Sequence, residues 1–532
     1  MKKVFIILTL LFSFCYGDLF AQEKGRLSGS IESNSQIYRN DSKIGAKAPK
    51  DKFGSNNYLN LNYSYGNFRA GIQYEAYFPP LLGYSNKLED EGIVHKYVSY
   101  EDQNLTITVG NFYEQFGSGL LFRAWEDRQL GLNNALEGVN IKFRPTKYIS
   151  LKAVYGKQRK YFDTGDGKIR GVDGEINILE GLNIKGNTVF ILGGGYINRY
   201  QEYTGPLENY PQSVDAWSAR LDFTSGKSAF QIEYVNKGKD GSSLPSQIFP
   251  EGSALLANYS YTQHGLGLNA SFRRLENMTF RSERNAVDNE LFINYLPANT
   301  KQHKYSLPNL YPYSTQAMGE IGGQIDLVYT IKKKTALGGK YGTRISLNYS
   351  HYNKLDGTLV DGAFYSSSDF LSLDGAKLYR DFNVEIQKKW SKRIKSYFTF
   401  MNLEYNKGVI EGDNKGIVKA KVFVADLLYK FKKGKALRGE IQYLNTRQDM
   451  KDWIAGSLEY NIGSRWSFFV SDMYNSGKTK LHYPNFGGSY VKNSTRFSIS
   501  YGRQKAGLLC VGGVCRMVPA ASGLSFSLSK KF

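Results

Sequence analysis

Hydrophobic and polar residues alternate along most of this chain with a period of two. In the segment 58–65 the apolar positions are Leu59, Leu61, Tyr63 and Tyr65. The polar positions between them are Asn60, Asn62 and Ser64. Because successive side chains of a strand point to opposite faces, this pattern predicts strands with one apolar face and one polar face.

The same alternation recurs in segments spread over the whole sequence: 68–75, 105–110, 217–224, 266–273 and 344–349. Their charged residues stay on one face, as Arg220, Asp222, Arg273 and Arg344 do. A hydrated lumen accepts such charges, whereas the core of a β-sandwich does not. We therefore expect the polar face to line a lumen and the uncharged face to contact lipid or a core.

The connections between these segments favour a membrane barrel. Short links at 145–147, 226–227 and 463–464 alternate with long ones at 111–136, 275–319 and 353–377. Outer-membrane barrels alternate short periplasmic turns with long extracellular loops, and about 21 residues per strand give about 24 strands, within roughly 22 to 26. We predict an all-β fold, a single large antiparallel transmembrane β-barrel.

The first residues have the layout of a secretory signal peptide. Two lysines precede an apolar run at 4–14, and small residues follow at Gly17 and Ala21. We predict a signal peptide at 1–21, with Gly17 as a competing cleavage position, and a barrel domain at 22–532. A lipoprotein signal is disfavoured because Cys15 follows Phe14.

Later segments exclude two other kinds of membrane protein. No further apolar run reaches roughly 18 residues, the minimum for a spanning helix. The strand pattern starts at about Leu27, so we expect no plug domain before the barrel. TonB-dependent transporters, which have a similar strand count, carry such a domain.

The last strand supplies a separate indication. Leu524, Phe526, Leu528 and Phe532 share one parity, with serines at 525, 527 and 529 on the other. A terminal strand ending in an aromatic residue resembles the signal read by the outer-membrane insertion machinery. We therefore predict Phe526, Leu528 and Phe532 as an insertion signal, and outer-membrane lipid and lipopolysaccharide as the surroundings of the mature protein.

The composition narrows the partners. The chain is polar on average, with a mean hydropathy of -0.43, yet it contains 40 Tyr and 32 Phe, which fits a barrel wall. The formal charge of +21 is dispersed, and an exported chain rarely meets nucleic acid, so no nucleic-acid partner is predicted. Lysine clusters at 332–334 and 430–435 are expected to lie in solvated turns.

Signals for catalysis are weak. Only five histidines exist, and His264 and Ser271 are too far apart along one strand to form a hydrolase pair. No Cys and His spacing suits a metal, and Gly193 to Gly195 suggest a kink or bulge in a strand. No catalytic residue, metal or cofactor is predicted, and the protein is not expected to be an enzyme.

Cys510 and Cys515 flank the sequence Val-Gly-Gly-Val. Gly512 and Gly513 suit a two-residue turn that needs positive φ, which leaves the cysteines as a close non-hydrogen-bonded pair. In an exported protein such a pair forms a disulfide by default. We predict a Cys510–Cys515 bridge in the last extracellular loop, with two free buried thiols as the alternative.

Two long loops are candidates for function. In the segment 111–138, Arg123, Glu126, Asp127 and Arg128 lie close together among apolar residues. Opposed charges on an inward loop form a selective constriction in porins, and the alternative is a salt-bridged loop that packs as a cap. The loop 275–319 is rich in Tyr and Pro, which form a surface for a glycan or a partner or simply order the loop.

Three strings resemble an outer-membrane β-barrel family of unknown function: YEQFGSGLLFRAWEDRQLGLNNALEG, NYLPANTKQHKYSLPNLYPY and GRQKAGLLCVGGVCRMVPAASGLSFSLSKKF. The resemblance implies fold and location over the mature chain and transfers no activity. We expect a porin-like or transport-related role. The main alternative is a structural or assembly subunit of an outer-membrane complex, with a plugged lumen and loops that dock protein partners, and a third is a surface hydrolase.

Overall fold

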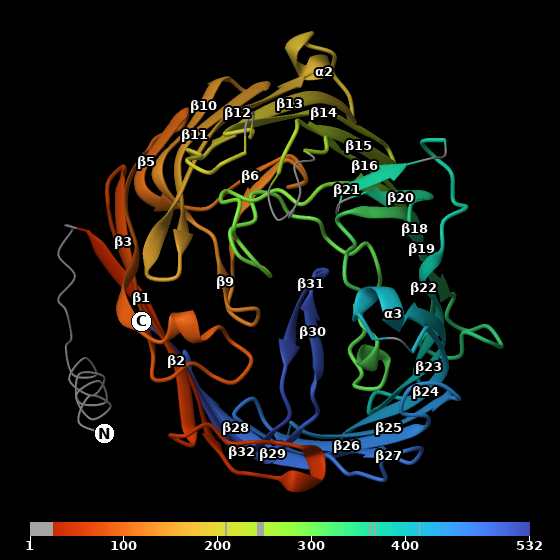
Figure 1. Ribbon diagram of the computed structural model, residues 1–532. Coiled ribbons are helices and arrows are strands. Elements are labelled where there is room, and N and C mark those ends of the chain that lie inside the picture. Colours follow the sequence, from red (N-terminus) through yellow and green to blue (C-terminus); the bar gives the residue numbers. More distant parts are fainter. Residues whose placement is uncertain are drawn as a thin grey trace.

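The computed structural model describes residues 25–532 except 208–209, 242–248, 361–362, 367–368, 414 and 433. Its strands form a closed ring when the barrel is viewed along its axis (Figure 1). Within the described residues, helices are too short and too polar to cross a membrane. The predicted signal peptide at 1–21 lies outside the described residues.

The wall is a sheet of 24 strands in which each strand pairs antiparallel with its neighbours. These strands are β1 Arg26–Tyr38, β2 Phe53–Tyr65, β3 Phe68–Tyr77, β4 Glu91–Glu101, β5 Leu105–Phe112, β10 Leu136–Thr146, β11 Ile149–Lys160, β12 Asp163–Asn177, β13 Thr188–Tyr200, β14 Ser213–Ser225, β15 Ser228–Lys237, β16 Gly252–Gln263, β17 Leu266–Glu276, β18 Gly319–Ile331, β19 Thr343–Asn353, β22 Lys377–Lys389, β23 Ile394–Asn406, β24 Ile417–Lys430, β25 Lys435–Thr446, β26 Trp453–Ile462, β27 Trp466–Asn475, β28 Asn485–Lys492, β29 Thr495–Gln504 and β32 Ala521–Lys531. The predicted fold class and strand number are confirmed.

Short elements lie in the connections. Four two-stranded hairpins are β6 Glu114–Phe116 with β7 Phe122–Ala124, β8 Glu126–Asp127 with β9 Leu132–Asn133, β20 Gly357–Val360 with β21 Ala363–Ser366, and β30 Gly507–Val511 with β31 Val514–Val518. The helical turns are η1 Ser42–Ile44, η2 Asn86–Leu88, α2 Ile178–Gly181, η3 Pro308–Leu310 and α3 Lys407–Ile410.

The first and last strands close the ring. β1 pairs with β32 from Ser30 opposite Lys531 to Tyr38 opposite Gly523, and on its other side with β2. Closure leaves no edge strand, and in a membrane every backbone N–H and C=O must be satisfied in this way. The terminal strand with Phe526 and Leu528 is thus part of the closed wall, while its role as an insertion signal stays a prediction.

The alternating pattern sorts residues between the two faces of the wall as expected. On β14, Trp217 and Phe223 are 46% and 39% exposed on the outside, whereas Arg220 is 4% exposed. On β19, Tyr349 is exposed and Asn348 is buried. The polar face therefore points into the lumen and the aromatic and aliphatic face points to lipid.

The two ends of the barrel differ in loop length. Most connections at one end, such as 66–67, 226–227 and 493–494, have two or a few residues. The other end carries the long loops, and we call the two the turn end and the loop end. Three connections depart from the expected alternation: the link 161–162 at the loop end is short, and the turn-end connections 178–187 and 332–342 are long.

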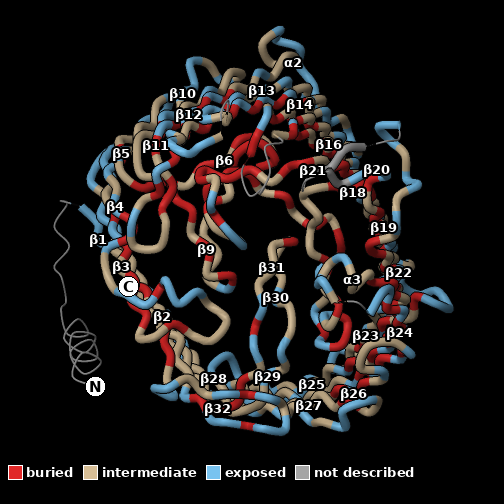
Figure 2. The backbone as a smooth tube through the Cα atoms, viewed as in Figure 1, coloured by how far each residue is buried: buried red, intermediate tan, exposed pale blue. Residues whose placement is uncertain are grey.

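Two of the long loops fold into the ring (Figures 1 and 2). Loop 113–135, between β5 and β10, buries Phe116, Leu120 and Phe122 completely. Loop 277–318, between β17 and β18, buries Tyr305, Leu307 and other residues against the inner wall. We call these segments the inner loops.

Of the kink or bulge expected at Gly193 to Gly195, the bulge is absent from the wall. The pairing of β13 with β12 and β14 runs through Gly193, Gly194 and Gly195 without a register shift, so the glycines form neither a bulge nor an interruption. A Cβ on Gly195 would lie 2.9 Å from a methyl carbon of Leu121. The glycine therefore leaves room for an inner loop to approach the wall.

A buried ion pair fixes loop 277–318 to the wall. Arg273 on β17 pairs with Glu320 on β18, and both side chains are fully buried. Glu320 also accepts a hydrogen bond from the Tyr313 hydroxyl at 2.7 Å and another from the Gln316 N–H at 2.6 Å. The carboxylate thus joins two wall strands to the end of the loop.

Replacement of Arg273 by Ala is expected to lower the free energy of unfolding by about 3–5 kcal/mol, because the buried Glu320 carboxylate loses its counter-ion. Arg69→Ala is the control: Arg69 pairs with Glu101 at 3.0 Å, but its side chain is 60% exposed, and a screened pair of this kind contributes less than about 1 kcal/mol. Urea unfolding in phospholipid vesicles, followed by gel mobility, measures both. Equal losses would contradict the anchoring role.

Candidate functional site: the lumen

The inner loops cover one arc of the wall with apolar side chains. Leu120, Leu121 and Phe122 of loop 113–135 pack in one cluster with wall residues of β11 to β17. Tyr305, Leu307, Tyr311 and Tyr313 of loop 277–318 pack in a second cluster with residues of β19 to β26. The lumen is therefore filled along the arc from β11 to β26.

Polar contacts between the inner loops and this arc supplement the packing. The Tyr305 hydroxyl donates to Asp426 at 3.1 Å, and the Leu307 N–H donates to the Gln442 amide oxygen at 3.0 Å. The Ser118 N–H of the other inner loop donates to Glu233 at 2.9 Å. Inward charges and amides of the wall thus find partners in the loops, as buried polar groups require.

The two inner loops also hold each other. The Arg123 N–H donates to the carbonyl of Ile293 at 2.8 Å, and the Tyr295 N–H donates to the carbonyl of Gly119 at 2.9 Å. The Arg123 guanidinium lies over the rings of Trp125 and Tyr295, at 4.9 and 4.2 Å. Together the loops form a single internal plug.

The remaining arc has a different inner surface. On β1, β29 and β32 this surface includes several inward serine and asparagine side chains that remain partly exposed. The cross-strand pairs join Ser498 to Ser527 and Ser527 to Asn34, and in the next row Ser500 to Ser525. We call these five residues the serine strip.

The register shows that the serine strip faces inward. Ser529 lies opposite Glu32 on β1, so the two share a face with Ser527. Glu32 forms an ion pair with Arg128 of an inner loop, at a distance of 2.8 Å. The alternate face carries Phe497 and Ile499, which are exposed to the outside.

The hairpin β30–β31 lies inside the ring (Figure 1), in contact with the plug. It reaches toward the middle of the ring (Figure 1), and Cys510 and Cys515 form the predicted disulfide between its strands. Its tip contacts loop 277–318: the carbonyl of Gly512 accepts from the Ala298 N–H and the Tyr295 hydroxyl, both at 3.1 Å. We call this element the disulfide hairpin.

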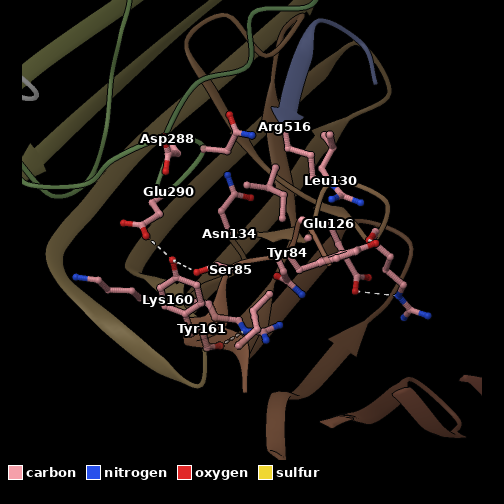
Figure 3. Close-up of a pocket in the computed structure, with 18 of the residues that line it drawn as sticks. Tyr84, Ser85, Glu126, Leu130, Asn134, Lys160, Tyr161, Asp288, Glu290 and Arg516 are labelled. Carbon is pink, nitrogen blue, oxygen red and sulfur yellow. Dashed lines mark hydrogen bonds and ion pairs between the residues drawn. The ribbon is translucent and has the colours of Figure 1, made fainter. Parts of the chain in front are cut away.

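A chamber of about 570 Å³ lies beside the disulfide hairpin (Figure 3). Residues from three kinds of element line it: Tyr58 and Glu75 of the wall, Glu126 and Arg128 of one inner loop, and Arg516 of the hairpin. The lining is mixed: tyrosines and paired charges alternate with apolar side chains such as Leu130, Leu291 and Met517.

The four predicted constriction residues do not act as one group. Arg128 and Glu126 line the chamber, and the Arg128 guanidinium pairs with Glu126 at 3.1 Å as well as with Glu32. Asp127 accepts from the Leu130 N–H at 2.9 Å within its own turn. Arg123 is stacked inside the plug. Of the four residues, only Arg128 and Glu126 thus lie at the contact between inner loop 113–135 and the part of the wall that no loop covers.

Charges at the loop end are stabilised by their neighbours. Burial raises the pKa of the Glu290 carboxyl, but hydrogen bonds from Tyr161 and from Lys87 outweigh it, so the pKa lies below its ordinary value. Burial lowers the pKa of the Arg516 guanidinium, and Tyr84, whose ring centroid is 4.1 Å away, offsets part of this effect. Loop 277–318 is therefore tied to neighbouring loops by ionised groups at neutral pH.

The second candidate loop proves to be a packing element. Tyr305, Tyr311 and Tyr313 are each 3% exposed, so their rings order the loop and offer no stacking surface. Asp426, which accepts from the Tyr305 hydroxyl, and Asp449, which accepts from the Tyr311 hydroxyl, are not identifiable as partners from sequence because they lie more than a hundred residues away. The alternating serines of the last strand were visible in the sequence. Their position on an uncovered part of the inner wall was not predicted.

A sequence comparison identifies the family. The sequence matches the family of unknown function DUF6029 over residues 1–532. This chain belongs to the DUF6029 family. No curated protein matches it. The apolar belt of the closed wall and the family assignment agree with the predicted resemblance, and this DUF6029 protein is an integral outer-membrane β-barrel.

A search of solved structures finds outer-membrane proteins similar to the DUF6029 chain at low identity. A chain of the E. coli P pilus tip assembly intermediate PapC-PapD-PapK-PapG has a TM-score of 0.50 and 11% identity, covering 97% of this chain and 62% of that one. The siderophore receptor PirA from Pseudomonas aeruginosa has a TM-score of 0.39 and 10% identity, covering 95% and 80%. A BenF-like porin from Pseudomonas fluorescens Pf-5 has 0.36 and 11%, covering 80% and 98%. The first likeness shows the barrel fold alone.

Arg128→Gln is expected to make any current through the barrel more cation-selective, because it leaves Glu32 and Glu126 at the open wall without their shared cation. The reversal potential under a KCl gradient in planar bilayers measures this. Lys147→Gln is the control, since it removes one positive charge at an exposed turn-end pair with Glu180. An unchanged reversal potential in Arg128→Gln would contradict the location of the constriction.

Proposed function

We propose that this protein is a gated transport barrel through which small polar solutes pass along the serine strip. The observation that supports it most is the division of the lumen: the inner loops fill the arc from β11 to β26, whereas the serine strip carries short hydroxyl and amide side chains that remain partly exposed. Short polar side chains keep a wall wide and hydrated, as a porin lumen requires.

Arg128 and Glu126 form the selective point of this path. They project from loop 113–135 toward the wall, where Arg128 meets Glu32 beside Ser529. Opposite charges at such a point create a local field that orients and selects polar solutes. The predicted constriction is therefore retained in the proposal for Arg128 and Glu126, but not for Arg123 and Asp127.

The disulfide hairpin is the gate in this proposal. It contacts both inner loops through a few hydrogen bonds, among them the bond from the Asn289 amide to the carbonyl of Cys515 at 2.8 Å and the bond from Arg516 to the carbonyl of Gln129 at 2.8 Å. Small polar contacts of this kind separate more easily than a large apolar interface. The hairpin is therefore able to move without unfolding the plug.

A second function is favoured by the plug itself. A lumen filled by two packed loops suits a structural or assembly subunit of an outer-membrane complex, whose remaining loops dock partners. In that case the serine strip is simply hydrated and conducts nothing. Purified protein that stays silent in bilayers and co-purifies with other outer-membrane proteins would support this alternative.

Cysteine accessibility tests the path directly. In Ser498→Cys and Ser527→Cys, a charged methanethiosulfonate reagent is expected to modify the new thiol and reduce the current, because these positions line the solute path. Ser350→Cys is the matched control, since Ser350 is also an inward wall serine but is 0% exposed under the plug. Unmodified thiols on the serine strip, or a parent barrel without current, would overturn the transport proposal.

Removal of the gate is the complementary test. Replacement of residues 508–517 by a short Gly-Ser link is expected to increase single-channel conductance, because the hairpin no longer occupies part of the lumen. The control shortens 334–339, a turn-end segment that closes on itself through the Lys334 N–H and the Gly339 carbonyl. Equal conductance of the parent and the hairpin variant would show that the hairpin is not a gate.

A further inference from the structure

The turn end of the barrel carries a marked charge asymmetry. The turns and adjoining strand ends at 332–344, 387–397, 428–437, 461–468 and 489–498 together hold 17 Lys and Arg and no Asp or Glu. The net charge of the whole chain is +21. Most of the excess positive charge is thus concentrated at one end of the barrel, on the arc from β18 to β29. We call this region the basic rim.

The cations of the basic rim have no acidic partners. Within the described residues, none of them forms an ion pair, although most are exposed. Two turn-end cations on the opposite arc do form ion pairs, Arg69 with Glu101 and Lys147 with Glu180. The basic rim is therefore an uncompensated surface and not a network of surface salt bridges.

Exposed aromatic rings lie among these cations on the outer face. Trp390, Phe431 and Trp466 are 54%, 44% and 45% exposed. The Lys388 ammonium lies 4.6 Å from the centroid of the Trp390 ring. Exposed Trp and Tyr mark the depth at which the lipid chains end and the headgroups begin. The basic rim therefore lies at headgroup level, on the side of the short turns.

We infer that the basic rim binds the phosphate groups of anionic phospholipids in the periplasmic leaflet of the outer membrane. Clustered Lys and Arg beside a membrane-spanning segment attract anionic lipid, and each cation near the surface adds to the attraction. The inference does not depend on the proposed transport function.

The position of the cations favours lipid over a soluble acidic protein. The outward-facing Lys388, Lys435 and Lys492 continue strand faces whose other residues contact lipid, such as Ile386, Leu437 and Tyr490. Headgroups reach these side chains without leaving the bilayer. A soluble partner reaches the turns but not cations on the lipid-facing side.

Fluorescence quenching at Trp390 tests this directly. The other four tryptophans are changed to Phe, and the barrel is reconstituted in phosphatidylcholine vesicles containing brominated phosphatidylglycerol or brominated phosphatidylcholine. We expect the anionic lipid to be enriched beside Trp390 about fivefold, the ratio that one cation contact at the surface provides. The enrichment should fall when NaCl is raised from about 0.05 M to about 0.5 M, because salt screens exposed charges.

The matched variants each remove four positive charges. Changing Lys388, Lys389, Lys392 and Arg393 to Gln is expected to abolish the enrichment. Changing Lys43, Lys47, Lys50 and Lys52 to Gln, which are exposed in a loop-end connection, should leave it unchanged. Equal quenching by the two lipids in the parent, or equal enrichment in both variants, would overturn the inference.

Native mass spectrometry keeps the test decisive if the single-tryptophan barrel does not fold. Barrels with all five tryptophans are extracted from mixed phosphatidylglycerol and phosphatidylcholine vesicles, and retained lipids are counted. We expect the parent and the loop-end variant to retain more phosphatidylglycerol than the rim variant. Equal retention by all three would refute lipid binding, and capture of an acidic periplasmic protein by the rim without lipid retention would assign the surface to that partner instead.

Discussion

Closure of the sheet is the constraint on which the rest of this structure depends. In a membrane, each backbone N–H and C=O of the wall must find a partner, and the pairing of β1 with β32 removes the only two edges. A ring of 24 strands encloses a lumen too wide for wall side chains to fill. The long loops therefore have an interior to occupy, and the two inner loops and the disulfide hairpin occupy part of it (Figure 1).

The inner wall is divided according to what those loops supply. Large apolar and charged residues lie inward where a loop packs on them, as Leu403 and Asp426 do. On β29 and β32, where no loop is packed, inward serines such as Ser498 and Ser527 remain partly exposed, whereas inward Ser350 on the filled arc is fully buried. Water satisfies short polar groups, whereas buried charges need protein partners such as the Arg273–Glu320 pair. The wall sequence thus matches a plug on one arc and a hydrated surface on the other.

The wall was predictable from sequence because its signal is local. Side-chain parity within a strand and glycines in two-residue turns identify the strands, and the Val-Gly-Gly-Val turn identifies the Cys510–Cys515 bridge. The interior was not predictable, because the partners of Tyr305 and Leu307 lie 121 and 135 positions away. Distant partners also explain why Arg123 and Arg128, close in sequence, differ in environment. Arg123 stacks on Tyr295 inside the plug, whereas Arg128 forms an ion pair with Glu32 on β1.

The disulfide has a physical consequence for the hairpin that carries it. An isolated two-stranded hairpin is at best marginally stable in water, and β30–β31 pairs with no strand of the wall. Its contacts to the inner loops are few. Without the disulfide, the hairpin would stay folded only while it is docked against those loops. A covalent link between Cys510 and Cys515 restricts the unfolded chain and keeps the hairpin formed in either position. In the proposed gating, the disulfide would let the hairpin move as a unit.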